Sequence, residues 1–112
     1  MRGTRSLALA LLAAGLGLAG ACTAALRHAT PGDAALVAPR WPGTTVEDLE
    51  RGRRLYVRRC SGCHNLFLPR AFPPERWPRL VDEMAEKGRL GPAEREDVTR
   101  FLVAVASDPR RR

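Results

Sequence analysis

The chain has 112 residues, with 19 Lys and Arg against 12 Asp and Glu, and its formal net charge is +7. This length allows one domain, which excludes a multidomain enzyme, a helical repeat array and a polytopic membrane protein. A chain this small buries only about 60–65% of the surface that it exposes when unfolded. We therefore expect a metal, a disulfide or a large cofactor to stabilise the fold.

The first 21 residues have the composition of a secretion signal peptide. Arg2 and Arg5 precede an apolar stretch at residues 7–19, and small residues lead to Cys22. Three outcomes are open: cleavage and lipidation at Cys22, cleavage by an ordinary signal peptidase, or retention as an uncleaved anchor. Each outcome places the rest of the chain in a periplasmic or other extracytoplasmic space. Lipidation or an anchor would also tether it to the membrane.

The remaining chain divides into three parts. Residues 22–44 are rich in Ala, Pro, Gly and Thr, which is typical of a flexible linker. Residues 107–112 form a basic tail, and residues 45–106 are expected to form the domain. No run of five or more residues alternates β-branched and polar side chains, so an all-α fold is predicted.

Three helices are predicted in this domain, and the first and third have clear ends. The first begins after Thr44 or Thr45 and ends near Arg59. The third begins at Pro92, because proline favours the first helical position, and it is stopped at Asp108.

The second predicted helix covers about residues 75–87. Pro78 must lie in its first turn, because deeper in a helix it would remove a hydrogen bond. Gly88 suits the C′ position beyond its end. Four apolar residues share one face of this helix: Trp77, Leu80, Val81 and Met84.

Cys60, Cys63 and His64 form the sequence Cys-x-x-Cys-His, the attachment sequence of c-type haem. The spacing places both sulfurs near neighbouring vinyl groups of one porphyrin, and the histidine supplies a nitrogen ligand to iron. A zinc site would need a fourth ligand, such as His28 or an acidic residue. A redox dithiol would need a preceding strand, and a disulfide across two residues would be strained. We interpret the segment as the site of one haem c, with its iron, per chain.

The run from Gly52 to His64 resembles the first helix and haem site of class I cytochrome c. In that family a glycine and an aromatic residue stand at these distances before the first cysteine. Residues 95–102 resemble the last helix of the family, and the resemblance covers the whole predicted domain. It implies a small cytochrome c-like fold with three main helices around the haem. It also implies a close helix crossing at Gly52, with Tyr56 packing near Phe101.

The sixth iron ligand of this family is usually a methionine, and beyond the leader the chain contains only Met84. A methionine on an apolar helix face is often core filler. We expect Met84 to be the distal ligand opposite His64, with His28 or an open, five-coordinate iron as alternatives. The expected haem pocket contains five further residues: Tyr56, Trp77, Leu80, Val81 and Phe101.

Two ring N–H groups of the expected site, those of His64 and Trp77, each need a hydrogen-bond acceptor. The His64 ring N–H needs an acceptor, for which a carbonyl in residues 69–74 is a candidate. We expect Trp77 to be an ordinary core residue, with a hydrogen bond from its indole N–H to a haem propionate as the alternative.

These features predict a monohaem electron carrier that is not an enzyme and has no catalytic residues. Its arginines would dock on redox proteins with acidic surfaces. The basic stretch lacks interleaved aromatic residues, so nucleic-acid binding is not expected. A monomer is expected. The alternatives are a haem-based sensor or enzyme with a labile sixth ligand, or a tethered electron-transfer subunit of a larger respiratory complex.

Overall fold

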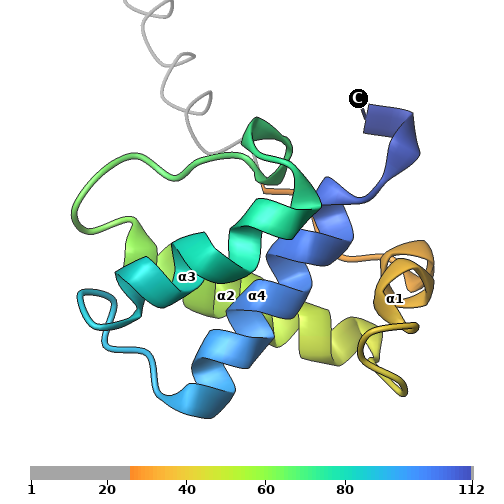
Figure 1. Cartoon of the computed structure of the whole chain (residues 1–112), viewed down its shortest axis with the longest axis horizontal. Coiled ribbons are helices and arrows are strands. Elements are labelled where there is room, and N and C mark those ends of the chain that lie inside the picture. Colours follow the sequence, from red (N-terminus) through yellow and green to blue (C-terminus); the bar gives the residue numbers. More distant parts are fainter. Residues whose placement is uncertain (1–25, 112) are drawn as a thin grey trace, which may run out of the picture.

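The computed structural model describes residues 26–111, and this part of the chain is helical without any strand (Figure 1). The all-α prediction is confirmed. The α-helices are α1 (Pro31–Val37), α2 (Val46–Cys60), α3 (Trp77–Ala85) and α4 (Pro92–Ala106). Three short 3₁₀ turns accompany them: η1 (Pro69–Ala71), η2 (Pro74–Arg76) and η3 (Pro109–Arg111).

The predictions for the leader and for Cys22 fall on residues 1–25, outside the described residues. Between residues 26 and 111, no helix is both long enough and apolar enough to span a bilayer.

Helices α2 and α4 begin as predicted. The Thr45 hydroxyl accepts the Asp48 N–H at 3.1 Å, and the Asp48 carboxylate accepts the Thr45 N–H at 2.8 Å. This reciprocal capping satisfies donors that the first turn would otherwise leave free. Pro92 is the first residue of α4 and follows Gly91.

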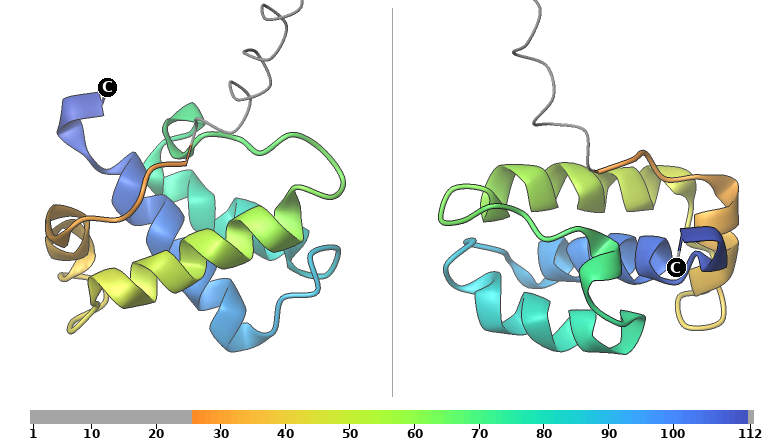
Figure 2. Two further views of the ribbon diagram at one scale, coloured as in Figure 1. Left: turned by 180° about the vertical axis from the view of Figure 1, so that it is seen from behind. Right: turned by 90° about the horizontal axis from the view of Figure 1, so that it is seen from above.

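Helices α2 and α4 cross in close contact at Gly52. A Cβ built on Gly52 would lie 2.0 Å from the Asp97 carbonyl oxygen and 3.0 Å from the Phe101 Cβ, so only glycine fits. Arg51 holds the crossing, since its Nε and Nη2 donate to the two Asp97 oxygens at 2.7 and 3.0 Å. Seen from above, α2 and α3 are separated and α4 runs at a level between them (Figure 2).

Residues 26–44 differ from the flexible linker expected from composition. They contain α1, which is capped by Thr30 and packs against α4 and α2. Val37 at its end is 2% exposed and belongs to the core. The packed unit therefore begins well before residue 45, and the described domain has a fourth helix that the sequence did not predict.

An ion cluster ties α1 to the segment after α4. The Arg27 guanidinium donates to both Asp33 oxygens at 2.6 and 2.7 Å and to Asp108 at 3.2 Å. The two carboxylates are 1% and 2% exposed. Burial raises the pKa of Asp33, but hydrogen bonds from Arg27 and Thr30 outweigh it, so the pKa is lowered. Residues 107–112 were expected to be a tail, yet Asp108 is part of this cluster.

Glu50 connects the same N-terminal segment to α2. Its carboxylate accepts the Ala29 N–H at 2.7 Å, contacts His28 Nδ1 at 3.0 Å and accepts Arg53 Nε at 3.0 Å. Burial opposes ionisation of Glu50, but these hydrogen bonds outweigh it and lower its pKa to about 2. Folding at this end of α2 therefore favours the ionised carboxylate.

Helix α3 has Pro78 in its first turn as predicted, but its end differs. The left-handed residue is Arg89, with φ 53°, not Gly88. The Leu90 N–H donates to the Ala85 carbonyl at 2.9 Å and the Arg89 N–H to the Glu86 carbonyl at 3.1 Å. This pair is a Schellman motif with Arg89 at C′. Burial of Leu90, which is 7% exposed, places the turn one residue later than expected.

Candidate functional site

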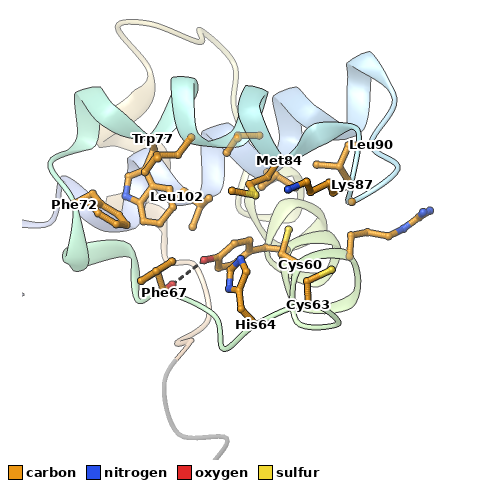
Figure 3. Close-up of a pocket in the computed structure, with 16 residues that line it drawn as sticks. Cys60, Cys63, His64, Phe67, Phe72, Trp77, Met84, Lys87, Leu90 and Leu102 are labelled. Atoms are coloured by element: carbon orange, nitrogen blue, oxygen red, sulfur yellow. Dashed lines mark hydrogen bonds between the residues drawn. The ribbon is translucent and has the colours of Figure 1, made fainter.

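A cavity of about 190 Å³ lies between the C-terminal end of α2, the segment that follows it, and α3 (Figure 3). Side chains of α4 contribute to its lining. The lining is mostly apolar and aromatic and consists of Tyr56, Arg59, Cys60, Cys63, His64, Phe67, Phe72, Trp77, Leu80, Val81, Met84, Lys87, Gly88, Leu90, Val98 and Leu102.

One wall of the cavity carries the Cys-x-x-Cys-His residues. Cys60 is the last residue of α2, and Cys63 and His64 lie in the turn that follows it. Both cysteines are free thiols. The wall therefore presents two unpaired sulfurs and an imidazole to one apolar space.

The tautomer of His64 suits a metal ligand. Its Nδ1 lies 2.7 Å from the Asn65 carbonyl oxygen, which can only accept, so Nδ1 carries the proton. Nε2 is then left with its lone pair. The acceptor is this neighbouring carbonyl, not one in residues 69–74 as expected.

Met84 lies on the opposite wall, on α3. Figure 3 shows Met84 and His64 on opposite sides of the cavity, with Cys60 and Cys63 toward one end. Met84 is 39% exposed, so it does not serve as core filler. His28 is bonded to Glu50 and does not line the cavity, whereas the Met84 thioether does.

Four of the five expected pocket residues line the cavity, namely Tyr56, Trp77, Leu80 and Val81. Phe101 does not, and its placement there was wrong. It is 0% exposed and packs at the helix crossing beside Gly52. The apolar surface of α4 is wide enough to serve two contacts, so Val98 and Leu102 face the cavity instead.

Phe67 and Phe72 belong to the site, although the sequence analysis did not identify them. The rings form a series with centroid distances of 5.6 Å from His64 to Phe67, 5.2 Å from Phe67 to Phe72 and 5.3 Å from Phe72 to Trp77. The chain has only three phenylalanines, and two of them lie between His64 and Trp77. This clustering of phenylalanines is the feature of the sequence that could have assigned them to the site.

Two buried side chains donate to the backbone of the same segment. The Tyr56 hydroxyl donates to the Phe67 carbonyl at 2.8 Å, and Trp77 Nε1 donates to the Pro69 carbonyl at 2.8 Å. The indole N–H is therefore bonded within the protein, and Trp77 is 3% exposed, which agrees with the core position expected for it rather than with the alternative of a propionate contact. Burial raises the pKa of Tyr56 to about 12, so its hydroxyl remains a donor at neutral pH.

The charged residues in the lining are both cations, Arg59 and Lys87. Lys87 is the only lysine of the chain. Arg59 also reaches the Arg89 carbonyl at 3.4 Å and Glu94 at 3.5 Å, which joins the end of α2 to the turn after α3. The Cys60 end of the cavity is thus bordered by positive charge.

The residues of this cavity fit a c-type haem. Two free thiols at the attachment spacing, an imidazole with an available Nε2 and a thioether opposite it surround one apolar space. Across residues 26–111, no group of three or more His, Cys, Asp or Glu side chains is placed to hold a metal ion directly. The zinc alternative therefore lacks a ligand set in the part of the chain that is described.

One of three comparisons with known proteins bears on the class of cofactor. Searches among curated proteins and among solved structures gave no match. The family model of dihaem cytochrome c matches residues 56–112, which include the attachment sequence. That family is named for two haems, whereas the sequence resembles the monohaem class I family. Both are families of c-type cytochromes, and this coarser class is what the match supports. Because the match covers just over half of the 112 residues, the chain belongs to the dihaem cytochrome c family.

Proposed function

We propose that this chain is a c-type cytochrome that carries single electrons between redox proteins outside the cytoplasmic membrane. The observation that carries the proposal is the single apolar cavity shared by Cys60, Cys63, His64 and Met84. The Cys60 and Cys63 thiols would hold the haem through thioether bonds, each formed by addition of S–H to a vinyl group without any oxidant or reductant. His64 and Met84 would bind its iron.

We further propose one haem per chain, although the matched family is named for two. The sequence contains one Cys-x-x-Cys-His, and its remaining cysteine, Cys22, has no cysteine or histidine partner at that spacing. Two haems on these 112 residues would need a second attachment sequence. The ratio of iron to polypeptide in the purified holoprotein tests this: one supports the proposal and two refutes it.

Electron carriage is favoured over catalysis by the contents of the cavity. When bound, the haem supplies an iron that alternates between Fe(II) and Fe(III). The titratable groups lining the cavity are the two cysteines, His64, Tyr56 and two cations. Tyr56 donates to a backbone carbonyl. In the proposed site the cysteines attach the haem, His64 binds its iron, and the two cations lie at the edge of the cavity. None is left to act as a general acid or base on a substrate.

The border of the cavity indicates the kind of partner. Lys87 lines the Cys60 end of the cavity together with Arg59, and it forms no ion pair among the described residues. A positive border of this kind attracts an acidic protein surface. We propose transient docking of a monomer there. The rate of reduction by an acidic donor should fall steeply as ionic strength rises, and a rate independent of salt would contradict this docking.

The exposure of Met84 favours one alternative, a sensor or enzyme with a labile sixth ligand. Carbon monoxide separates the two functions. A carrier whose thioether stays on the reduced iron should bind it weakly, whereas a sensor should bind it readily at low concentration.

Export remains part of the proposal, because haem attachment outside the cytoplasm agrees with the signal-like residues 1–21. We propose attachment to the membrane through a lipid on Cys22 or through an uncleaved leader. Expression of the full chain with and without a Cys22→Ser substitution, followed by membrane fractionation, tests the lipid.

The decisive experiment is the alkaline pyridine spectrum of the full chain matured with a haem-attachment system. We expect a thioether-type α-band that survives acid–acetone extraction. A Cys60→Ala/Cys63→Ala variant is the matched control and should lose its colour in the extraction. Loss of colour from the wild-type protein would refute covalent haem and with it the proposed function.

A further inference from the structure

The segment at residues 65–72 forms one end of the cavity and connects its two walls. It begins directly after His64 and leads through η1 towards α3, which carries Met84. Its backbone is held by a side chain from each wall: Tyr56 of α2 bonds the Phe67 carbonyl and Trp77 of α3 bonds the Pro69 carbonyl.

Both donors are buried and touch each other. Tyr56 is 5% exposed and Trp77 is 3% exposed. Their rings meet edge to face, with centroids 6.3 Å apart. The Trp77 bond is buried and the Tyr56 bond is partly buried. Removing the donor of a buried hydrogen bond leaves its acceptor unsatisfied, which is the costly case for such bonds. The two donors and the segment are thus one connected unit, and Phe67, Phe72 and Trp77 are seen at the left of Figure 3.

We propose that Tyr56 and Trp77 act as a clamp, defined as these two side chains and their bonds to residues 67 and 69. The clamp fixes the separation of the His64 wall from the Met84 wall. Both are positioning residues for iron ligation, and this inference rests on the proposed haem site.

The places of the two residues in the helices explain the effect. Tyr56 lies one helical turn before Cys60, and Trp77 lies two turns before Met84 on the same face of α3. Because both helices are anchored to the same short segment, a slip of the segment moves one wall relative to the other. At the opposite end of the cavity, Arg59 of α2 donates to the Arg89 carbonyl in the turn after α3 at 3.4 Å. The two walls are therefore joined at both ends.

The test uses the holoprotein and measures the affinity of the ferric haem for imidazole, which competes for the position opposite His64. Tyr56→Phe and Trp77→Phe keep an aromatic ring and remove the donor. We expect each to raise the apparent imidazole affinity about fivefold, the change that follows from losing one hydrogen bond. In the double variant the gain should be smaller than the product of the single gains, because either loss releases the same segment.

Phe101→Leu is the matched control. It perturbs a fully buried residue that does not line the cavity, so it should lower the melting temperature and leave imidazole affinity within about twofold of wild type. Unchanged affinity in both clamp variants would overturn the inference, and so would an equal rise in Phe101→Leu. A colourless wild-type protein would instead refute the haem site itself.

A measurement on the wild-type holoprotein covers the case in which the variants fail to mature. The Trp77 indole N–H should exchange with solvent as slowly as the core amides of α4. Rapid exchange would show that the bond to the Pro69 carbonyl is not held, and it would overturn the clamp.

Discussion

Replacing Gly52 by alanine tests the helix crossing that supports the whole site. The added Cβ would stand 2.0 Å from the Asp97 carbonyl oxygen and 2.7 Å from its carbon, whereas ordinary contact begins at 3.4 Å. The obstacle is helix backbone, which cannot rotate away, so α2 and α4 would have to separate by more than 1 Å.

Overpacking of this kind costs at least about 3 kcal/mol, the upper end of the usual range. The better helix propensity of alanine returns about 1 kcal/mol at most. We expect a net loss of about 2–3 kcal/mol. For a domain of this size each kcal/mol lowers the melting temperature by about 4–8 °C, so the fall should be about 10–20 °C.

The assay is thermal unfolding of the holoprotein, followed by far-UV circular dichroism. Gly32→Ala is the matched control, because its Cβ would meet only the Thr30 hydroxyl at an ordinary 3.6 Å. The control should melt within about 3 °C of wild type. If Gly52→Ala also melted that close to wild type, the crossing would not be as tight as the structure shows.

Three further outcomes are expected. Met84→Ala should shift the ferric haem toward high spin and lower the reduction potential, as judged by absorbance and redox titration, since a methionine ligand raises the potential. Because the pKa of Glu50 falls from about 4.5 to about 2 on folding, its contribution is complete above pH 4.5 and is lost as the pH falls toward 2. Glu50→Gln should therefore lower the melting temperature at pH 7 and flatten its decline across that window. Arg27→Ala should destabilise the fold by about 3 kcal/mol, measured by denaturant titration, because it removes the ion-pair partner of the buried Asp33 carboxylate. It should leave the haem spectrum unchanged.

The helices of residues 45–106 could be predicted because their signals are local. Thr45 caps α2 through a residue three positions away, and Pro92 occupies the first position of α4 whatever the rest of the chain does. The attachment sequence is local as well, since Cys60, Cys63 and His64 act through their spacing. Such features need no knowledge of the tertiary fold.

Helix α1 was not predicted, although its start has the same local signals, since Thr30 and Asp33 form a capping box and Pro31 is its first residue. The contacts that hold it against the domain are distant in sequence. Its composition of Ala, Pro and Gly is that of a linker, and the helix is short. It is ordered by Arg27, which bridges Asp33 to a carboxylate 81 residues away at Asp108. Only the folded chain brings these groups together.

The misplacement of Phe101 has a related cause. Periodicity shows that a face of α4 is apolar, but it does not say which neighbour each part of that face meets. Phe101 packs into the space beside Gly52, whereas Leu102 lines the cavity. The acceptor of the His64 N–H could not be assigned from the sequence for the same reason, because it depends on the path of the backbone after His64.

Helix α2 connects all of these contacts. Its first half is bonded to the segment before α1 through Glu50, its middle is locked against α4 at Gly52, and its last turn carries Tyr56 and Cys60. The cavity wall formed by α2 is therefore held at three points along the helix, so it cannot move independently of the rest of the domain. An electron carrier benefits from such rigidity, because ligands that stay in place in both oxidation states leave little structure to rearrange at each transfer. The stability of the α1 contact, remote from the cavity, is therefore expected to contribute to the speed of electron transfer.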